Sequence, residues 1–384
     1  MEEKINLIKS IGEEIIGGEN LERLLTHKKN VVAYDGFEPS GRMHIAQGLL
    51  RAHNVNKFIK AGIKFKFWVA DWFALMNLKM GGDLSKIQKA GQVMIKTWAA
   101  CGMDVNALDE EGNPMIEFIW SSEEINKRSD EYWKLVLDIG TRFGLNRIKK
   151  CTMIMGRKEE ENNNEMILKL NSMLDSLFLL NDMDEIQKKQ IDIKNIMNQL
   201  IEKDTTTTDL AASQIFYPVM QCADVFFLGV DITSLGMDQR KCNMLVLEYC
   251  DKIKRKNKPI IISHHMVMGL DGSDKMSKSN PDNTIFMDDT PAEVKRKINM
   301  AFCEEGNIVV NPLLDWIKHI ILPINMTFVI SKDEKWNEME MIYSDYKQLE
   351  TDFEAKKIHP KRLKLAMITH LNNMLQPIQK IMKT

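Results

Sequence analysis

The segment Val31–Gly48 (VVAYDGFEPSGRMHIAQG) constrains the fold more than any other part of the chain. It starts with an apolar run that predicts a buried strand, passes through a turn with Pro39 and two glycines, and ends in apolar residues at helical spacing. The N–H groups at the start of a helix have no partner within the helix, so they can bind an anion. The segment predicts a strand–turn–helix unit with an anion site, although an ordinary strand–helix connection has the same outline.

A second segment, Lys275–Ser279 (KMSKS), lies far along the chain in a run rich in Gly, Asp, Asn and Pro, which predicts a loop. Two ammonium groups on a mobile loop can close on a triphosphate and stabilise the charge that develops on a leaving pyrophosphate. Two lysines alone describe an ordinary solvated surface, so the interpretation depends on their combination with the first segment.

Further apolar runs at Lys64–Ala70 and Met115–Trp120 predict strands, and helical patterns separate them from each other and from the first strand. This alternation predicts an α/β fold with a doubly wound, Rossmann-like parallel sheet, which binds ligands at the carboxyl ends of its strands. The side chains expected at those ends belong to Tyr34, Asp71 and Ser121.

The rest of the chain divides into three kinds of segment. Residues 3–27 predict one or two helices before the first strand, and Pro259–Met268 predicts a buried strand that leads to the lysine loop. An almost wholly helical pattern predicts an all-α second domain over residues 291–384, after an α/β domain of residues 1–290. Two amphipathic patterns within residues 157–208 predict a helical hairpin inserted in the first domain.

The balanced charge of the chain gives little indication of its binding partners, whereas its cysteines indicate the cellular compartment. The chain has 52 Lys and Arg against 54 Asp and Glu, so only three local clusters, at residues 147–150, 252–258 and 356–364, suggest a polyanionic partner. The six cysteines have no metal-ligand spacing and fit a reducing compartment. The start of the chain is acidic, unlike a signal or transit peptide, and no apolar run has membrane length. We therefore expect a cytoplasmic protein with no membrane association.

The adjacent His264 and His265 invite comparison with a metal site. Neighbouring residues on a strand point to opposite faces of the sheet, so the two rings cannot share one ion. No metal-ligand set is therefore predicted from the sequence.

Together the two segments resemble the paired signatures of the class I aminoacyl-tRNA synthetases, commonly written HIGH and KMSKS, which hold ATP from opposite sides. The first reads His44-Ile45-Ala46-Gln47 here, with the leading histidine present and Gln47 in the place of the second. The second is intact.

Nearly the whole chain, apart from residues 157–208, is similar to tyrosyl-tRNA synthetases of the eukaryotic and archaeal type. The similarity implies that L-tyrosine reacts with ATP, with Mg²⁺ on the phosphates, to give tyrosyl-adenylate, and that the tyrosyl group passes to the 3′ end of tRNA(Tyr). It also implies a homodimer. The segments that carry it are YDGFEPSGRMHIAQG, KMGGDL, WSSEEIN, YPVMQCADVFFL, LGMDQRK, SHHM and KMSKS.

The spacing of Tyr217, Gln221 and Asp224 places them on one face of a predicted helix. With Tyr34 and Gln239 they could line a small polar pocket, although each could equally pair within the helices. The resemblance assigns Tyr34 and Asp224 to the substrate hydroxyl, and Tyr217, Gln221 and Gln239 to its ammonium group.

The same resemblance assigns catalysis to His44, Lys275 and Lys278, with in-line attack of the tyrosine carboxylate on the α-phosphorus and no protein nucleophile. Gly236 and Asp238 are expected near the ATP ribose. The full set expected to bind ATP is Ser40, His44, Gln47, Gly236, Asp238, Lys275, Met276, Ser277 and Lys278.

Near the C-terminus the chain departs from the family pattern. The family usually reads HPGDLK, and its aspartate meets the first anticodon base, whereas here Arg362 stands where the acid is expected. The resemblance implies tRNA contacts by Trp336, His359 and Arg362, although a basic residue on a solvated surface explains Arg362 equally well.

Two alternative functions stay open at this point. A tryptophanyl-tRNA synthetase shares the fold and both signatures, but Tyr217 and Asp224 suit a hydroxyl better than an indole. A synthetase-like protein could bind RNA without activating an amino acid, but His44 and the intact KMSKS segment favour activation.

Overall fold

The computed structural model describes residues 1–152, 164–177, 182–207, 211–276, 280–332 and 339–383. Its centre is a six-stranded sheet with the order β1-β6-β5-β2-β3-β4, in which every neighbouring pair is parallel except β1 and β6. The predicted parallel sheet is confirmed. The strands are β1 (Glu14–Ile16), β2 (Val32–Phe37), β3 (Lys64–Val69), β4 (Ile116–Trp120), β5 (Ile232–Gly236) and β6 (Ile260–His264).

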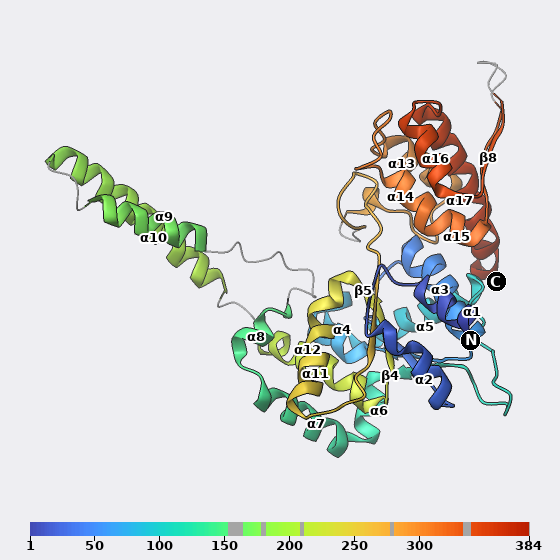
Figure 1. Cartoon of the computed structure of the whole chain (residues 1–384), viewed down its shortest axis with the longest axis horizontal. Coiled ribbons are helices and arrows are strands. Elements are labelled where there is room, and N and C mark those ends of the chain that lie inside the picture. The colour runs from blue at the N-terminus through green and yellow to red at the C-terminus, as the bar shows by residue number, and fades with distance from the viewer. Residues whose placement is uncertain (153–163, 178–181, 208–210, 277–279, 333–338, 384) are drawn as a thin grey trace.

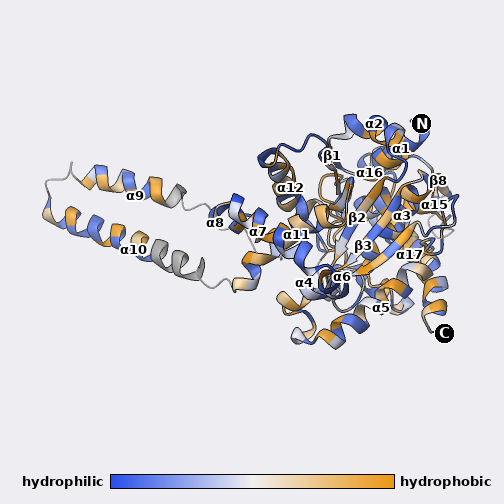
Figure 2. Cartoon of the chain, turned by 90° about the horizontal axis from the view of Figure 1, so that it is seen from below, coloured by the Kyte–Doolittle hydropathy of each residue, from blue (hydrophilic) through white to orange (hydrophobic). Residues whose placement is uncertain are grey.

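Both faces of the sheet are covered by helices, which is why its strands are apolar almost throughout. One face packs against α3 (Arg51–Lys60) and α5 (Leu84–Ala100), and α17 (Pro360–Lys383) packs on α5. The other face packs against α11 (Ala212–Phe227) and α12 (Arg240–Lys252), and α7 (Ser129–Arg142) packs on α11. In Figure 2 the strands β2 and β3 lie between α11 and α12 on one side and α3 and α17 on the other.

Side chains along β3 point alternately to the two faces of the sheet and pack into a different hydrophobic core on each face. Phe67 stacks on Trp98 of α5, with ring centroids 4.8 Å apart, and on Phe118 of β4 at 5.1 Å. The next residue, Trp68, points to the other face and meets Phe227 of α11 edge-on at 6.3 Å. Successive side chains on a strand face opposite ways, so one short segment serves both cores.

The remaining helices connect the strands or form the C-terminal region. Among the described residues, no helix is both long enough and apolar enough to span a lipid bilayer. The helices that connect the strands or form the C-terminal region are α1 (Glu2–Lys9), α2 (Leu21–His27), α4 (Asp71–Met76), α6 (Ser121–Lys127), α8 (Leu145–Lys149), α13 (Pro291–Met300), α14 (Pro312–Trp316), α15 (Leu322–Asn325) and α16 (Tyr346–Glu354), with π-helical turns η2 (Ala46–Leu50) and η7 (Ile317–Ile321).

The N-terminal region contains a strand that the sequence did not predict. The predicted helices α1 and α2 are present, but β1 lies between them and pairs antiparallel with the edge strand β6. A three-residue strand is too short to show a period of two, and its partner is far away in the sequence. Its existence depends on the unpaired edge that β6 offers.

Tyr34 does not lie at the end of its strand, as the sequence suggested. β2 continues past it to Phe37, because β2 pairs with β3 along its whole length. Gly36 makes this possible, since a Cβ there would lie 2.6 Å from the hydroxyl oxygen of Tyr34. Ser121, in contrast, directly follows β4 and begins α6, and Asp71 follows β3 after one residue and begins α4.

The C-terminal region is helical with one interruption. A two-stranded antiparallel hairpin, β7 (Phe328–Ile330) and β8 (Met341–Tyr343), lies between α15 and α16, and the prediction of an all-α region did not include it. One cluster of buried side chains runs from the sheet into this region. The domain boundary at residue 290 stays a prediction, although α13 begins at Pro291 with Thr290 as its N-cap.

Within residues 157–208, the described residues form two long helices, α9 (Asn164–Leu177) and α10 (Met183–Thr207). They lie side by side and project from the body as a single arm (Figure 1). The predicted helical pattern is therefore present, while residues 157–163, 178–181 and 208 fall outside the described ranges.

A buried ion cluster joins the C-terminal region to the segment that follows β2. Asp289 is fully buried and accepts from Lys297 of α13 at 2.6 Å and from Arg42 at 2.8 Å. The Lys297 ammonium group, itself 3% exposed, also donates to the carbonyl oxygen of Thr284 at 3.0 Å. Buried charges are tolerated only when they are paired in this way.

We expect Lys297→Met to lower the free energy of unfolding by roughly 3–5 kcal/mol, because loss of the ammonium group leaves the buried charge of Asp289 poorly compensated. Lys295→Met on the same helix is the matched control, since Lys295 is exposed and its loss should change stability little. Denaturant unfolding of both variants measures the effect. Equal stability of the two variants would contradict the assigned role of Lys297.

Candidate active site

A cavity of about 560 Å³ opens at the carboxyl ends of β2, β5 and β6. Parallel α/β sheets bind ligands at this edge. The cavity collects twelve of the fourteen residues that the sequence assigned to tyrosine or ATP, although they are widely spread along the chain. They are Tyr34, Ser40, His44, Gln47, Tyr217, Gln221, Asp224, Gly236, Asp238, Gln239, Lys275 and Met276; Ser277 and Lys278 lie outside the described residues.

The inner end of the cavity is built around Asp224, which is 1% exposed. Its Oδ1 accepts a hydrogen bond from the hydroxyl of Tyr132 at 2.8 Å. Its Oδ2 is buried with no hydrogen-bond partner among the described residues, and the indole of Trp68 lies beside it without normal hydrogen-bond geometry. Burial raises the pKa of the Asp224 carboxyl well above its ordinary value, against the opposing effect of the Tyr132 hydrogen bond.

Tyr34 completes this end of the cavity and is also 1% exposed. Burial, together with the nearby Asp224, raises the pKa of the Tyr34 phenol well above its ordinary value, so the group keeps its proton. A buried carboxyl oxygen and a buried phenol can recognise one hydroxyl group. A ligand without that hydroxyl would leave the buried oxygen unsatisfied.

A second polar group lies around Glu38, which the sequence interpretation missed. The hydroxyl of Tyr217 donates to Glu38 Oε1 at 2.5 Å, and Asn77 Nδ2 donates to the same carboxylate at 3.2 Å. Nearby, Gln221 Nε2 donates to Gln239 Oε1 at 3.2 Å. A carboxylate beside amide and phenol oxygens can hold an ammonium group. The position of Glu38 within EPSG, directly after the first strand, was the available signal.

The two signature segments meet at the outer end of the cavity. His44 pairs with Phe286, and the N–H of Ile45 donates to the carbonyl oxygen of Ile285 at 2.9 Å. The residues just after the lysine loop are thereby fastened to the segment that carries His44. Lys275 reaches back to Asp238 at 3.6 Å, across the same cavity.

Deeper polar residues that the sequence interpretation did not assign to substrate binding also line the cavity. Asp35 is buried and pairs with Arg51 Nε at 2.9 Å; burial raises the pKa of its carboxyl to about 6, and Arg51 opposes the rise. His264 contacts the hydroxyl of Ser234 at 2.6 Å, and burial lowers the pKa of its imidazole to about 3, so the ring is neutral. These groups alternate along their strands with residues of the sheet core, so no local pattern marked them.

Asp71 and Ser121 have a structural role and do not line the cavity. The buried Asp71 carboxylate accepts from Ser121 Oγ at 2.7 Å, Ser122 Oγ at 2.6 Å and Gln88 Nε2 at 3.0 Å. The network ties the ends of β3 and β4 to the start of α5. Their expected position at strand ends was correct, but their side chains turn into the helix layer.

Comparisons with known proteins decide between the synthetases that share this arrangement. The family model described as tRNA synthetases class I (W and Y) matches residues 26–168 and 160–376. Tyrosine--tRNA ligase 1, cytoplasmic, from Arabidopsis thaliana is 44% identical over 385 residues, which are all of this chain and 86% of that protein. The tyrosine--tRNA ligase of Pyrococcus horikoshii is 31% identical, over 99% of this chain and 94% of its own. The chain belongs to the tyrosyl-tRNA synthetase family.

Solved structures of the family agree with this assignment. The Leishmania major tyrosyl-tRNA synthetase in complex with tyrosinol has a TM-score of 0.79 and 39% identity. The matched region covers 99% of this chain but only 50% of the Leishmania chain. The Pyrococcus horikoshii enzyme complexed with L-tyrosine has a TM-score of 0.76 and 30% identity, over 95% of its length. The chain is thus about half as long as the Leishmania one. A tryptophan-specific member of the class is not favoured, because the curated relatives named here are tyrosine--tRNA ligases.

The residues expected to contact tRNA in this family lie in three different situations. Arg362 is 8% exposed, and its Nη2 donates to the carbonyl oxygens of Ser331 at 3.1 Å and Met339 at 2.8 Å. It therefore holds the two sides of the β7–β8 hairpin, which differs from the expected position on an RNA-facing surface. His359 is exposed just before α17, and its Nδ1 accepts from the N–H of Lys361 at 3.1 Å. Trp336 lies outside the described residues.

The geometry of Asp224 leads to a prediction about substrate selection. We expect Asp224→Ala to reduce the ratio of kcat/KM for tyrosine over phenylalanine by roughly 5- to 150-fold. Phenylalanine leaves the buried oxygen of Asp224 without a partner, which costs about 1–3 kcal/mol, and the substitution removes that oxygen. Aminoacyl-adenylate formation with the two amino acids measures the ratio. Tyr132→Phe is the control, because it removes the partner of Oδ1 and leaves Oδ2 in place. An unchanged ratio in Asp224→Ala would make the residue merely structural.

Proposed function

We propose that this chain activates L-tyrosine with ATP, forming tyrosyl-adenylate and pyrophosphate, and then transfers the tyrosyl group to the 3′ end of tRNA(Tyr). The observation that carries the proposal is the continuity of the cavity. A hydroxyl-recognising end at Asp224, an anionic group at Glu38 and the two signature segments with His44 and Lys275 all line one space.

The amino acid lies with its hydroxyl at Tyr34 and Asp224 and its ammonium group at Tyr217, Gln221 and Gln239. Two features support this orientation. Asp224 Oδ2 is a buried oxygen in need of a partner, and Glu38 adds a negative charge beside Tyr217 for the ammonium group. Fixing both ends of the substrate holds its carboxylate in one position, and positioning of this kind supplies much of the rate enhancement in reactions without a protein nucleophile.

ATP lies between the signature segments. Gly236 and Asp238 meet its ribose, while Ser40, His44 and Gln47 face its phosphates from one side. Lys275 and Lys278, with Met276 and Ser277 between them, close from the other side. The carboxylate of tyrosine attacks the α-phosphorus in line, the bond to the bridging oxygen breaks, and pyrophosphate leaves with its charge stabilised by His44 and the two lysines.

Mg²⁺ is proposed to accompany the ATP phosphates. This ion usually keeps several waters and binds through one or two carboxylates together with substrate phosphates. Asp238 is a carboxylate of that kind in the ATP part of the cavity, where it faces Lys275. The ion would neutralise phosphate charge; the residues of the chain orient the two substrates.

A homodimer is proposed on the basis of an apolar surface over α7, α8 and α11. Trp133 and Leu137, one turn apart on α7, are 40% and 65% exposed. Leu145 on α8 and Phe216 on α11 are 54% and 53% exposed, and α7 and α8 both contact α11. Large apolar groups gathered on neighbouring helices are typical of a protein interface.

The remaining assignments concern tRNA, the domains and the compartment. We propose that residues 291–384 act as the anticodon-binding domain, with Trp336 and His359 as contacts and Arg362 supporting the β7–β8 hairpin. The catalytic domain would then comprise residues 1–290. A cytoplasmic location is proposed because two Arabidopsis relatives are named cytoplasmic.

Pyrophosphate exchange tests the proposed activity. The purified chain should exchange labelled pyrophosphate into ATP with tyrosine, and much less with tryptophan or with no amino acid. Exchange with tryptophan alone would show that tryptophan, and not tyrosine, is the amino acid that the chain activates. An absence of exchange in folded protein would favour a protein that binds RNA without activation.

The lysine loop leads to a prediction about the transition state. We expect Lys275→Ala or Lys278→Ala to slow adenylate formation by about 10²–10³-fold, with a much smaller effect on tyrosine affinity, because the ammonium groups meet developing phosphate charge. Single-turnover adenylate formation and equilibrium tyrosine binding separate the two effects. Lys256→Ala, an exposed lysine that does not line the cavity, is the control. A wild-type rate in both loop variants would remove the lysines from the mechanism.

The α9–α10 arm leads to a further prediction. It projects from the body and contributes no residue to the described cavity wall (Figure 1). Replacing residues 160–206 with a short Gly/Ser linker should therefore leave adenylate formation near the wild-type rate. Loss of that activity in a folded variant would show that the arm supports the catalytic site.

A further inference from the structure

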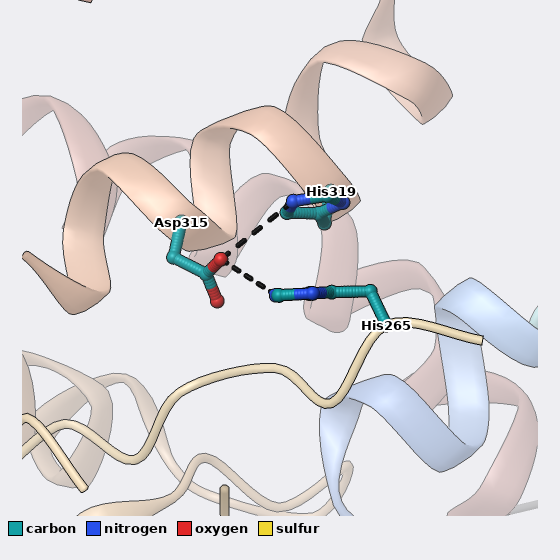
Figure 3. Close-up of side chains that lie close together, drawn as sticks. All are labelled: His265, Asp315 and His319. Carbon is teal, nitrogen blue, oxygen red and sulfur yellow. Dashed lines mark hydrogen bonds and ion pairs between the residues drawn. The ribbon is translucent and has the colours of Figure 1, made fainter. Parts of the chain in front are cut away.

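A compact cluster of ionisable side chains lies between the strand β6 and the C-terminal helices, next to the catalytic cavity, which shares His265 with it. His265 directly follows β6, Asp315 is on α14, and His319 is in the helical turn η7. Figure 3 shows that both imidazole rings point toward the Asp315 carboxylate. His265 Nε2 lies 2.7 Å from Asp315 Oδ1, and His319 Nε2 lies 3.7 Å from the same oxygen.

The imidazole of His265 lies between two carboxylates. Its Nδ1 faces Glu13 Oε2 at 3.3 Å, while its Nε2 faces Asp315. An ionised carboxylate only accepts hydrogen bonds, so each ring nitrogen must present either a hydrogen or a bound cation to its neighbour. With Nδ1–H donated to Glu13, Nε2 can face Asp315 either through a second hydrogen, as an imidazolium, or through a metal ion that both residues bind. A carboxylate behind a ligating imidazole is the arrangement that orients histidines at metal sites.

We propose that His265, Asp315 and His319 form a binding site for a divalent transition metal ion of the zinc type, with Glu13 orienting His265. Two imidazole nitrogens and one carboxylate oxygen suit zinc in charge and in ligand type. The three ligand atoms lie within 4.8 Å of one another. A cavity of about 400 Å³ lined by all three residues gives the ion a route to solvent and room for water ligands.

The observed distances define how the site must adjust. Metal–ligand bonds of about 2.0–2.2 Å at a tetrahedral ion place the ligand atoms roughly 3.3 Å apart, between the 2.7 Å and 3.7 Å observed here. The two rings are stacked, with centroids 3.9 Å apart and planes at 18°. An imidazole binds a metal in its own plane, so the His319 ring must turn out of the stack. It lies at the cavity wall with 28% of its side chain exposed, which leaves space for that turn.

The site would fasten two parts of the chain that are distant in sequence. Asp315 Oδ2 already accepts from the N–H of Met268 at 2.9 Å, and the indole of Trp316 donates to the carbonyl oxygen of Met268 at 2.8 Å. His265 and Met268 lie on the segment that leads from β6 to the lysine loop. A bound ion would therefore strengthen the attachment of this segment to the C-terminal helices. It is separate from the Mg²⁺ proposed for the ATP phosphates and does not depend on the proposed function.

The sequence argument against a metal site at His264 and His265 is consistent with this proposal. The two neighbours do face different partners, Ser234 and Asp315 respectively. The proposed site instead combines His265 with residues about fifty positions further along the chain, at separations that no metal-binding spacing describes.

Co²⁺ added to the metal-stripped full-length chain tests the site, because its visible absorption reports the ligands. We expect one ion per chain, with ligand-field absorption typical of nitrogen and oxygen ligands, and a higher melting temperature with Co²⁺ or Zn²⁺. His319→Ala should abolish the absorption while it keeps the bond between His265 and Asp315. Glu13→Gln should weaken binding by about tenfold or more, as loss of an orienting carboxylate does. His27→Ala, at an exposed histidine of α2 that lines neither cavity, should leave metal binding unchanged.

Three results would overturn the proposal. One is the absence of stoichiometric binding in the wild-type chain. Another is equal binding by wild type and His319→Ala, which would place the ion elsewhere. The third is a cobalt–thiolate charge-transfer band, which would show that cysteines bind the ion. Melting curves of each metal-stripped variant establish that it is folded, so a lost signal reports the ligand and not unfolding.

Discussion

The buried carboxylate of Asp289 holds together the parts on which the proposed catalysis depends. A charge removed from water is stable only if opposite charges and hydrogen bonds surround it. Asp289 therefore requires both Lys297 of α13 and Arg42, two residues before His44. The chain just before Asp289 also pairs with the backbone around His44: the N–H of Ile45 donates to the carbonyl oxygen of Ile285, and the N–H of Met287 donates to that of Met43. The position of the first signature segment is thus tied to the chain that leaves the lysine loop.

The attachment of the first signature segment through Asp289 has a consequence for the choice of amino acid substrate. The catalytic cavity has an inner wall made of buried polar groups in an otherwise apolar layer, with Tyr34 and Asp224 almost without solvent contact. Such groups are costly unless they are paired, so the pocket favours the ligand that satisfies them. Tyr132 satisfies one oxygen of Asp224 and leaves the other to the ligand. In the proposed function, the outer end that Asp289 holds sets where the carboxylate of the bound amino acid meets ATP.

Much of the fold could be predicted because its signals are local. The parallel strands show as apolar runs, and the face shared by Tyr217, Gln221 and Asp224 follows from helical spacing. The missed elements are short and depend on distant partners. β1 exists because β6 has an open edge, and the β7–β8 hairpin has Arg362 bridging its two sides. A basic residue in a basic run gives no local sign that it will be buried.

The sequence by itself determined the family of the chain, its α/β order and the residue types of its cavity, because motif spacing and periodicity are properties of neighbouring residues. Only the tertiary structure decided which polar groups meet. Glu38 joined Tyr217, Tyr132 joined Asp224, and His265 joined Asp315, across separations of 179, 92 and 50 residues. Contacts over such separations depend on how the helices pack on the two faces of the sheet. No periodicity within a single segment contains that information.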